Sequence, residues 1–326
     1  MRSTISRSSS AAIAIVAVVA AAVVVPTVAI YRHDVGRAYE RISTGSQIAE
    51  TRCGPIEYAI AGEGPPVLVV HGAGGGFDQG LDLGAALARS GFRIIAMSRF
   101  GYLRTPLPAD ASAAAQADAH ACLLDALNVP RAALLGVSAG GPSALAFALR
   151  HPDRTSALVL LVPAVYAPPS GEARPAHMSR GAAFAFDLVL RSDFVFWAGS
   201  KLAPSTFIRS VLGTPPELVV SPDEKARMRS MLERILPVKP RRLGLLNESV
   251  VLSSQSRAAL ETIAVPTLAI SAADDLYGTF EAARYTAEHV PNARFIGYPS
   301  GGHMLVGHEV ESAAAIAAFL RSAEPR

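Results

Sequence analysis

The stretch LLGVSAGG, residues 134–141, decides the fold because it joins an apolar run to a predicted helix. It contains the pattern G-x-S-x-G, in which the serine, here Ser138, occupies a sharp strand-to-helix turn that exposes its oxygen above a sheet. Gly136 and Gly140 flank it because larger side chains would collide across so tight a turn. The helix that follows directs its N-terminal amides and the positive end of its dipole at the turn. The pattern therefore predicts a nucleophilic serine, with the N–H of Ala139 as one oxyanion donor, rather than a glycine-rich turn with an idle serine.

Short apolar runs recur on both sides of this stretch and alternate with helical segments. A strand buried on both faces of a parallel sheet is a continuous apolar run, as in residues 67–70. Strands that alternate with helices of about 10 to 15 residues predict an α/β fold with a doubly wound, mostly parallel sheet. The predicted strands are 56–60, 67–70, 93–97, 132–135, 157–162, 265–270 and 293–298, and the predicted helices are 79–89, 112–127, 139–150, 279–289 and 309–322.

The alternation stops over residues 164–258, where no strand pattern is found. We predict that this segment is a helical insertion that forms a lid over the carboxyl ends of the strands, and that residues 51–163 and 259–326 form the core domain. Most of its aromatic side chains are expected to pack the lid onto the sheet, and one or two to line a pocket. These aromatics are Phe184, Phe186, Phe194, Phe196, Trp197 and Phe207.

Two polar turns follow the last two predicted strands. Asp274 and Asp275 come after residues 265–270, and His303 lies in a glycine-rich loop after residues 293–298. The glycines allow His303 to reach back over the sheet to Ser138 as a base. One of the two aspartates would hold one imidazole tautomer and stabilise the imidazolium.

Taken together, the chain resembles the α/β-hydrolase superfamily over about residues 50–322. The resemblance rests on four motifs and on the order serine, aspartate, histidine along the chain. The motifs are HGAGGG at 71–76, GVSAGG at 136–141, SAADD at 271–275 and GGH at 301–303.

The resemblance assigns further roles. The glycine-rich loop would supply the second oxyanion donor, the N–H of Ala73, with Gly74 as the alternative. His71 would shape that loop instead of acting as the base. The second aspartate, Asp275, would bind the histidine, and Asp274 would hydrogen-bond the turn.

One segment departs from the family pattern. Ser98 begins a turn in which many relatives have aspartate. The turn is expected to be structural, so the departure does not affect the three catalytic candidates. Contact between the substrate and Arg99 or Tyr102 is the lesser alternative.

The N-terminus is expected to lie outside the globular fold. A basic tail, residues 1–10, precedes residues 11–31, which contain no charged side chain and are long enough to cross a membrane. We predict a single transmembrane anchor, with a cleaved signal peptide as the alternative. Residues 32–50 are polar and predict a linker. An N-terminus in the cytoplasm and an extracytoplasmic catalytic domain are favoured because export is the usual task of such a leader.

Composition excludes some other classes. The net charge is only +3, and the basic residues are scattered, which argues against nucleic-acid binding. Cys53 and Cys122 lack a second cysteine or a histidine at metal-ligand spacing, so no metal site is predicted. They are expected to be buried free thiols, or a disulfide if the domain faces an oxidising compartment. No cofactor is required.

These residues predict a serine hydrolase that cleaves a carboxylic ester or lactone, with a small apolar molecule as substrate. Carbon–carbon bond hydrolases of ring-cleavage dienoates keep the same triad and are the alternative enzyme class. A member of the fold that binds a ligand without catalysis is the alternative outside enzymes.

Overall fold

A computed structural model describes residues 7–168 and 187–323 of the chain. Its core is an eight-stranded sheet in the order β1-β2-β4-β3-β5-β6-β7-β8. The first two pairings, β1 with β2 and β2 with β4, are antiparallel, and the others are parallel. The strands are β1 (Gln47–Thr51), β2 (Gly54–Ala61), β3 (Pro66–Val70), β4 (Arg93–Met97), β5 (Ala132–Val137), β6 (Thr155–Leu161), β7 (Thr267–Ala272) and β8 (Ala293–Tyr298).

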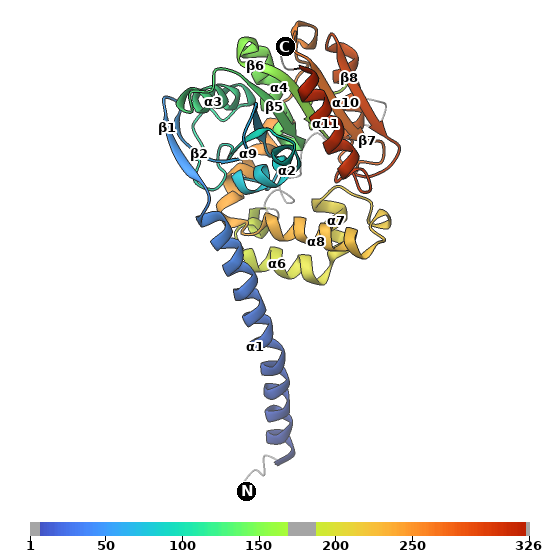
Figure 1. Ribbon diagram of the computed structural model, residues 1–326. Coiled ribbons are helices and arrows are strands. Elements are labelled where there is room, and N and C mark those ends of the chain that lie inside the picture. Colours follow the sequence, from blue (N-terminus) through green and yellow to red (C-terminus); the bar gives the residue numbers. More distant parts are fainter. Residues whose placement is uncertain (1–6, 169–186, 324–326) are drawn as a thin grey trace.

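Helices cover both faces of this sheet, as predicted (Figure 1). Strand β3 shows why the apolar runs are continuous: Leu68 and Val70 belong to the core on one face, and Val67 and Val69 to the core on the other. Helices α3 (Ala113–Ala126), α4 (Gly141–Arg150) and α10 (Thr279–His289) pack on the first face, and α2 (Phe77–Arg89) and α11 (Glu309–Ala323) on the second.

A helical insertion, residues 193–253, lies between β6 and β7 in the chain. Its main helices are α6 (Asp193–Leu202), α7 (Pro204–Val211), α8 (Pro222–Ile235) and α9 (Arg242–Ser253). Helices α6, α7 and α8 form a layer between the core domain and the free length of α1 (Figure 1). This layer has its own apolar core, which includes Trp197, Met228 and Leu232.

The aromatic side chains of the insertion differ from the prediction. Phe196 packs edge-on against Phe207, 5.3 Å between ring centroids, so both belong to the core of the insertion and not to the sheet. Phe194 and Trp197 contact the N-terminal helix. A separate helical layer needs its own apolar core, and Phe196, Trp197 and Phe207 contribute to it. Phe184 and Phe186 lie outside the described residues.

The predicted linker over residues 32–50 was wrong. Helix α1 (Arg7–Ser43) runs without a break from the apolar segment to the domain, and β1 follows it. Ala38 is buried against the insertion, and Arg41 donates hydrogen bonds to the Asp78 carboxylate, at 3.3 Å, and to the Leu236 carbonyl, at 2.5 Å. The polar residues of this segment have partners far away in the chain, which a local pattern does not reveal.

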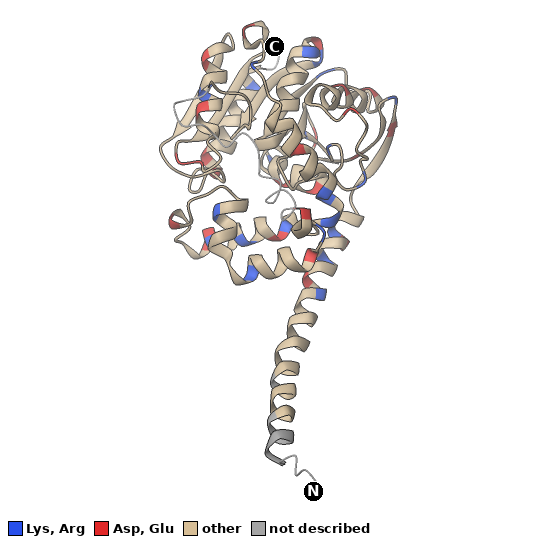
Figure 2. Ribbon diagram, turned by 180° about the vertical axis from the view of Figure 1, so that it is seen from behind, with Lys and Arg blue, Asp and Glu red and all other residues tan. Residues whose placement is uncertain are grey.

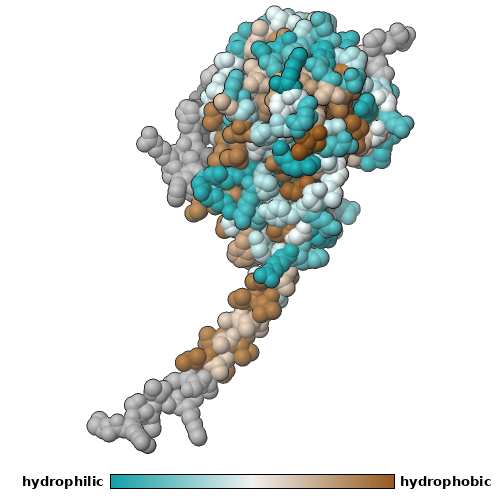
Figure 3. Space-filling model, turned by 90° about the vertical axis from the view of Figure 1, so that its left-hand side faces the viewer, coloured by the Kyte–Doolittle hydropathy of each residue, from teal (hydrophilic) through white to brown (hydrophobic). Residues whose placement is uncertain are grey.

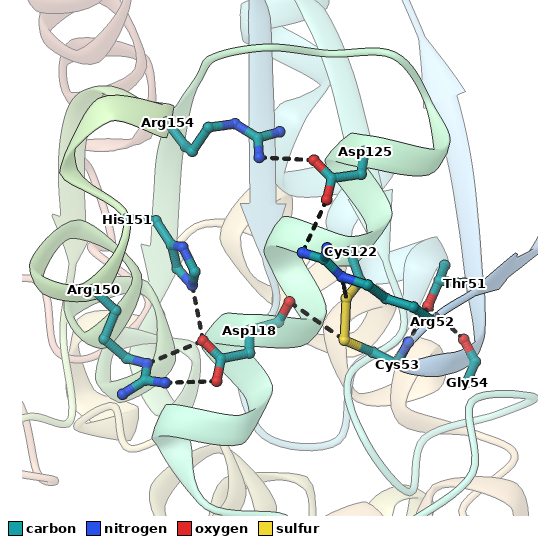
Figure 4. The surroundings of a disulfide bond; sticks show 10 residues. All are labelled: Thr51, Arg52, Cys53, Gly54, Asp118, Cys122, Asp125, Arg150, His151 and Arg154. Carbon is teal, nitrogen blue, oxygen red and sulfur yellow. Dashed lines mark hydrogen bonds and ion pairs between the residues drawn. A yellow bond between two sulfur atoms is a disulfide. The ribbon is translucent and has the colours of Figure 1, made fainter.

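Cys53 and Cys122 form a disulfide, so the expectation of free thiols was also wrong. The bond ties the turn between β1 and β2 to α3 (Figure 4). Beside it, Asp118 of α3 binds Arg150 and His151 at the end of α4. The two cysteines are 69 positions apart, so only the folded chain brings them together.

Candidate functional site

Ser138 occupies the sharp turn between β5 and α4. Its φ of 50° is in the left-handed region, which is rare for a residue with a side chain and is typical of strained functional positions. A Cβ at Gly140 would lie 2.3 Å from the Val70 carbonyl oxygen, and one at Gly136 would lie 2.5 Å from the Cβ of Ala144. Both positions therefore need glycine, as the sequence pattern indicated.

His303 connects Ser138 to Asp275. Its Nε2 lies 2.8 Å from Ser138 Oγ, and its Nδ1 lies 2.7 Å from Asp275 Oδ2. The carboxylate only accepts, so Nδ1 carries the proton and Nε2 is free to accept from the Ser138 hydroxyl. Both His303 and Asp275 are buried, whereas Ser138 is partly exposed. The chain thus brings together three residues separated by as many as 165 positions.

The environment of Asp275 keeps its carboxylate in place. The Tyr277 N–H donates to Oδ1 at 2.8 Å, and the Thr279 hydroxyl donates to Oδ2. The Tyr277 ring packs edge-on against His303, and burial, together with the nearby Asp275 charge, raises the pKa of Tyr277 to about 12. Asp274 instead accepts from the Gly302 N–H at 2.8 Å, on the loop that carries His303.

The glycine-rich loop after β3 lies against the serine turn. A Cβ at Gly72 would be 3.2 Å from the Cβ of Ser138, and the next residue, Ala73, is exposed. His71 is fully buried: Nδ1 lies 2.8 Å from the Gly72 carbonyl, and Nε2 accepts from the Arg99 N–H at 3.0 Å. Burial, and then the charge of Arg99, holds the pKa of His71 well below its usual value, so the ring stays neutral. The ring therefore shapes this loop.

Arg99 joins the two predicted oxyanion loops. Its guanidinium donates to the carbonyl of Gly72 at 3.2 Å and to the carbonyl of Ala139 at 3.2 Å. It also pairs with the Glu248 carboxylate of α9, which accepts from the Tyr102 hydroxyl at 2.5 Å. Burial, and then the Glu248 charge, raises the pKa of Tyr102 well above its usual value, so it remains a donor.

Glu248 has no counterpart among the sequence predictions. It lies in the insertion, outside every motif, and its partners are about 150 positions away, so no local signal marks it. Arg99 and Tyr102 stood only as lesser candidates for substrate contact, and the structure gives both of them partners within the protein.

The insertion also contacts the histidine loop. The Gly213 carbonyl, just after α7, accepts from the His303 N–H at 3.2 Å, and Thr214 Oγ1 accepts from the Met304 N–H at 3.1 Å. Ile235 of α8 lies over Gly74, where an added Cβ would be 3.2 Å from its side chain. Two sides of the Ser138 site are thus bounded by the insertion. Within residues 7–168 and 187–323, no group of three or more His, Cys, Asp or Glu side chains is placed to hold a metal ion.

Comparisons with known proteins agree with this architecture. A family model described as the alpha/beta hydrolase fold matches residues 65–309. The chain is 36% identical over 107 residues to an uncharacterized hydrolase of Bacillus subtilis, covering 33% of this chain and 37% of that protein. It is 40% identical over 104 residues to a 2-hydroxymuconate semialdehyde hydrolase of Pseudomonas putida, covering 31% of this chain and 37% of that protein. The chain thus spans little more than a third of the length of these two relatives.

A solved structure matches over a much longer part of the chain. It is an alpha/beta hydrolase fold protein from Nakamurella multipartita, with a TM-score of 0.69 and 26% sequence identity. The match covers 86% of this chain and 100% of that one.

Proposed function

The chain belongs to the alpha/beta hydrolase fold family, and on that premise we propose that it is a serine hydrolase that cleaves a carboxylic ester or lactone. The observation that carries the proposal is the continuous hydrogen-bonded chain from Ser138 through His303 to Asp275. Acyl transfer requires a nucleophile, a base and a group that orients the base. Each of these must lie within hydrogen-bond distance of the next.

In the proposed reaction, Ser138 Oγ attacks the carbonyl carbon of the ester and its proton passes to His303 Nε2. The carbonyl oxygen becomes an oxyanion, which the N–H groups of Ala73 and Ala139 bind. Asp275 stabilises the imidazolium formed at His303. The oxyanion then collapses, the alcohol leaves with the proton from Nε2, and an acyl-enzyme remains. A water molecule, deprotonated by the same nitrogen, attacks this ester, and a second collapse releases the acid and restores Ser138.

The insertion, predicted from the sequence over residues 164–258, serves in this proposal as the lid of the site. Its support is the pair of contacts described above, from Gly213 to His303 and from Ile235 to the loop at Gly74. A lid excludes bulk water from the oxyanion and strengthens the electrostatic interactions there.

We further propose that α1 anchors the protein in a membrane with the catalytic domain on the extracytoplasmic side, or leads its export before cleavage. Residues 13–43 include the one described helix that is long and apolar enough to span a bilayer, and its apolar window is wholly exposed. Figure 3 shows apolar side chains along the free length of this helix. The Cys53–Cys122 disulfide supports the extracytoplasmic placement, because disulfides persist in oxidising compartments.

A carbon–carbon hydrolase is the second candidate, favoured by the match to the semialdehyde hydrolase of Pseudomonas putida. The two are separated by assaying the full chain in detergent against p-nitrophenyl esters of graded acyl length and against one ring-cleavage dienoate. Turnover of the esters, lost in Ser138→Ala, is the expected result. Turnover of the dienoate alone would replace the ester proposal with the carbon–carbon one.

A further inference from the structure

Helix α6 presents an exposed apolar face. Phe194, Val195 and Leu202 are exposed, the last with 85% of its surface accessible, and Ala198 is partly exposed between them. These positions fall within a single arc of the helix at 3.6 residues per turn. Phe196, on the opposite side of α6, is buried in the insertion core, and Trp197, beside Phe194, is buried between that core and α1. We call the four exposed positions, Phe194, Val195, Ala198 and Leu202, the α6 face.

This face adjoins the N-terminal helix. The Tyr31 ring of α1 meets the Phe194 ring edge-on, with 5.1 Å between centroids, and the Trp197 ring at 5.4 Å. Asp34, one turn further along α1, accepts from the Trp197 indole N–H at 2.9 Å and pairs with Lys201 at 3.2 Å. Helix α6 is therefore fixed to α1 at one level along the α1 axis.

The contacts between α6 and α1 lie where the apolar segment of α1 ends. The uncharged stretch of α1 stops at Tyr31, and Arg32 is the first charged residue after it. Figure 2 shows the charged residues of α1 gathered where it meets the domain, and none along the tan length of the helix beyond that point. If residues 11–31 occupy the hydrocarbon, Tyr31 lies at the membrane interface, where aromatic side chains are enriched.

From these contacts we infer that the α6 face lies in the interfacial layer of the same bilayer that α1 spans, and that the enzyme takes its esters from that bilayer. A lipid surface is the occupant that fits, because the α6 face continues the lipid-exposed surface of α1 through the contact of Phe194 with Tyr31.

The substrate part of the inference rests on the proposed hydrolase function. The insertion lies between the free length of α1 and the core domain (Figure 1), and its loop at Gly213 contacts His303. A molecule leaving the bilayer at α6 therefore meets the layer that bounds the Ser138 site. An ester with a long acyl or alcohol chain, dissolved in the membrane, is the substrate class that this arrangement serves.

The surface is tested with a fluorescent label. Leu202→Cys in the full chain is labelled with an environment-sensitive nitrobenzoxadiazole dye and reconstituted in vesicles of phosphatidylcholine and phosphatidylglycerol. Val310→Cys is the matched control, because Val310 is 83% exposed but lies on α11 of the core domain. We expect a blue-shifted emission, quenched by nitroxide-labelled lipid, at position 202 and not at position 310. Equal, water-like emission at both positions would overturn the inference that the α6 face lies in the interfacial layer of the bilayer.

The substrate class is tested with Val195→Glu/Leu202→Glu, which places charges on the face without touching the site. We expect hydrolysis of soluble p-nitrophenyl acetate within about twofold of wild type, and hydrolysis of a vesicle-embedded long-chain ester lowered about tenfold. Unchanged rates on both substrates, with a blue-shifted label at 202, would refute the substrate class alone. A wild-type protein inactive on every ester would refute the proposed function and leave the result at position 202 to stand by itself.

Discussion

Replacing Glu248 with leucine tests two roles of the buried Arg99–Glu248 ion pair. The first is its contribution to folding stability, and the second is the positioning of the proposed oxyanion donor. Glu248 keeps 8% of its side chain accessible and its partner Arg99 keeps 9%. The substitution keeps the volume but removes the acceptor of both the Arg99 guanidinium and the Tyr102 hydroxyl. Arg99 is left as a buried charge without a carboxylate partner in the described structure, and it keeps the carbonyls of Gly72 and Ala139 and the face of the Tyr102 ring, 5.2 Å from its guanidinium carbon.

The magnitude follows from this burial. Removing one member of a buried ion pair costs about 3–5 kcal/mol of folding stability, since the other charge stays desolvated. For a domain of this size we expect the melting temperature to fall by at least about 6 °C. The Arg99 guanidinium also holds the Gly72–Ala73 peptide by its carbonyl, and the N–H of that peptide is the proposed oxyanion donor. Loss of a single oxyanion donor costs about 10²–10³ in kcat, so a displaced donor should cost about tenfold or more.

The assay measures melting temperature, kcat and KM for a p-nitrophenyl ester in Glu248→Leu and in the double variant Arg99→Met/Glu248→Leu. Replacing a buried pair by apolar residues is often neutral or stabilising, so the double variant should recover most of the lost stability. Its kcat should stay low with little change in KM, because the carbonyls of Gly72 and Ala139 have lost their donor. Glu281→Gln, which breaks an exposed pair with Arg284, is the control and should change stability by less than about 1 kcal/mol.

The result that would refute this reasoning is a double variant that is folded and has wild-type kcat. The ion pair would then stabilise the fold without positioning the oxyanion peptides. A Glu248→Leu variant with an unchanged melting temperature would contradict the prediction that an unpaired, buried Arg99 charge destabilises the fold.

Three further predictions concern other parts of the molecule. Asp275→Asn should lower kcat by about 10⁴-fold by favouring the wrong tautomer, whereas Asp274→Asn should have a much smaller effect in the same ester assay. Burial lowers the pKa of His120 to about 3, whereas an unfolded histidine titrates near 6.5. The unfolded chain therefore binds a proton that the folded chain does not, so below about pH 6.5 this group should remove about 1.4 kcal/mol of stability per pH unit. Denaturant unfolding at pH 7 and pH 5 should show a shallower loss for His120→Gln than for wild type, and an identical slope would contradict the assignment. Cys53→Ser/Cys122→Ser should lower the free energy of unfolding by about 2–4 kcal/mol, measured with urea, because the bond closes a long loop, and no change would contradict this role.

The elements that the sequence predicted well are those with local causes. Continuous apolar runs such as residues 67–70 become strands buried on both faces, because only a sheet covered by helices hides every side chain of such a run. The glycines around Ser138 and before His303 mark tight turns, and those turns bring Ser138, His303 and Asp275 within hydrogen-bond distance. Asp275 needed the family resemblance, because two adjacent aspartates are locally alike.

The features that were missed depend on partners far away in the chain. Residues 32–43 have the polar composition of a linker, and they are helical because Asp34 and Arg41 find partners in the insertion and the core domain. The pairing of Cys53 with Cys122 depends on the turn between β1 and β2 lying beside α3. Glu248 has the same character: its importance comes from burial beside Arg99, which no spacing rule describes.

The central claim, that Ser138 is an activated nucleophile, is tested most directly by covalent labelling. The full chain in detergent is treated with a fluorophosphonate probe, and the modified peptide is identified by mass spectrometry, with Ser138→Ala and His303→Ala treated in parallel. We expect labelling at Ser138 alone in the wild type, none in Ser138→Ala, and strongly slowed labelling in His303→Ala. A folded wild-type protein that resists the probe, or one that is labelled at another serine, would contradict it.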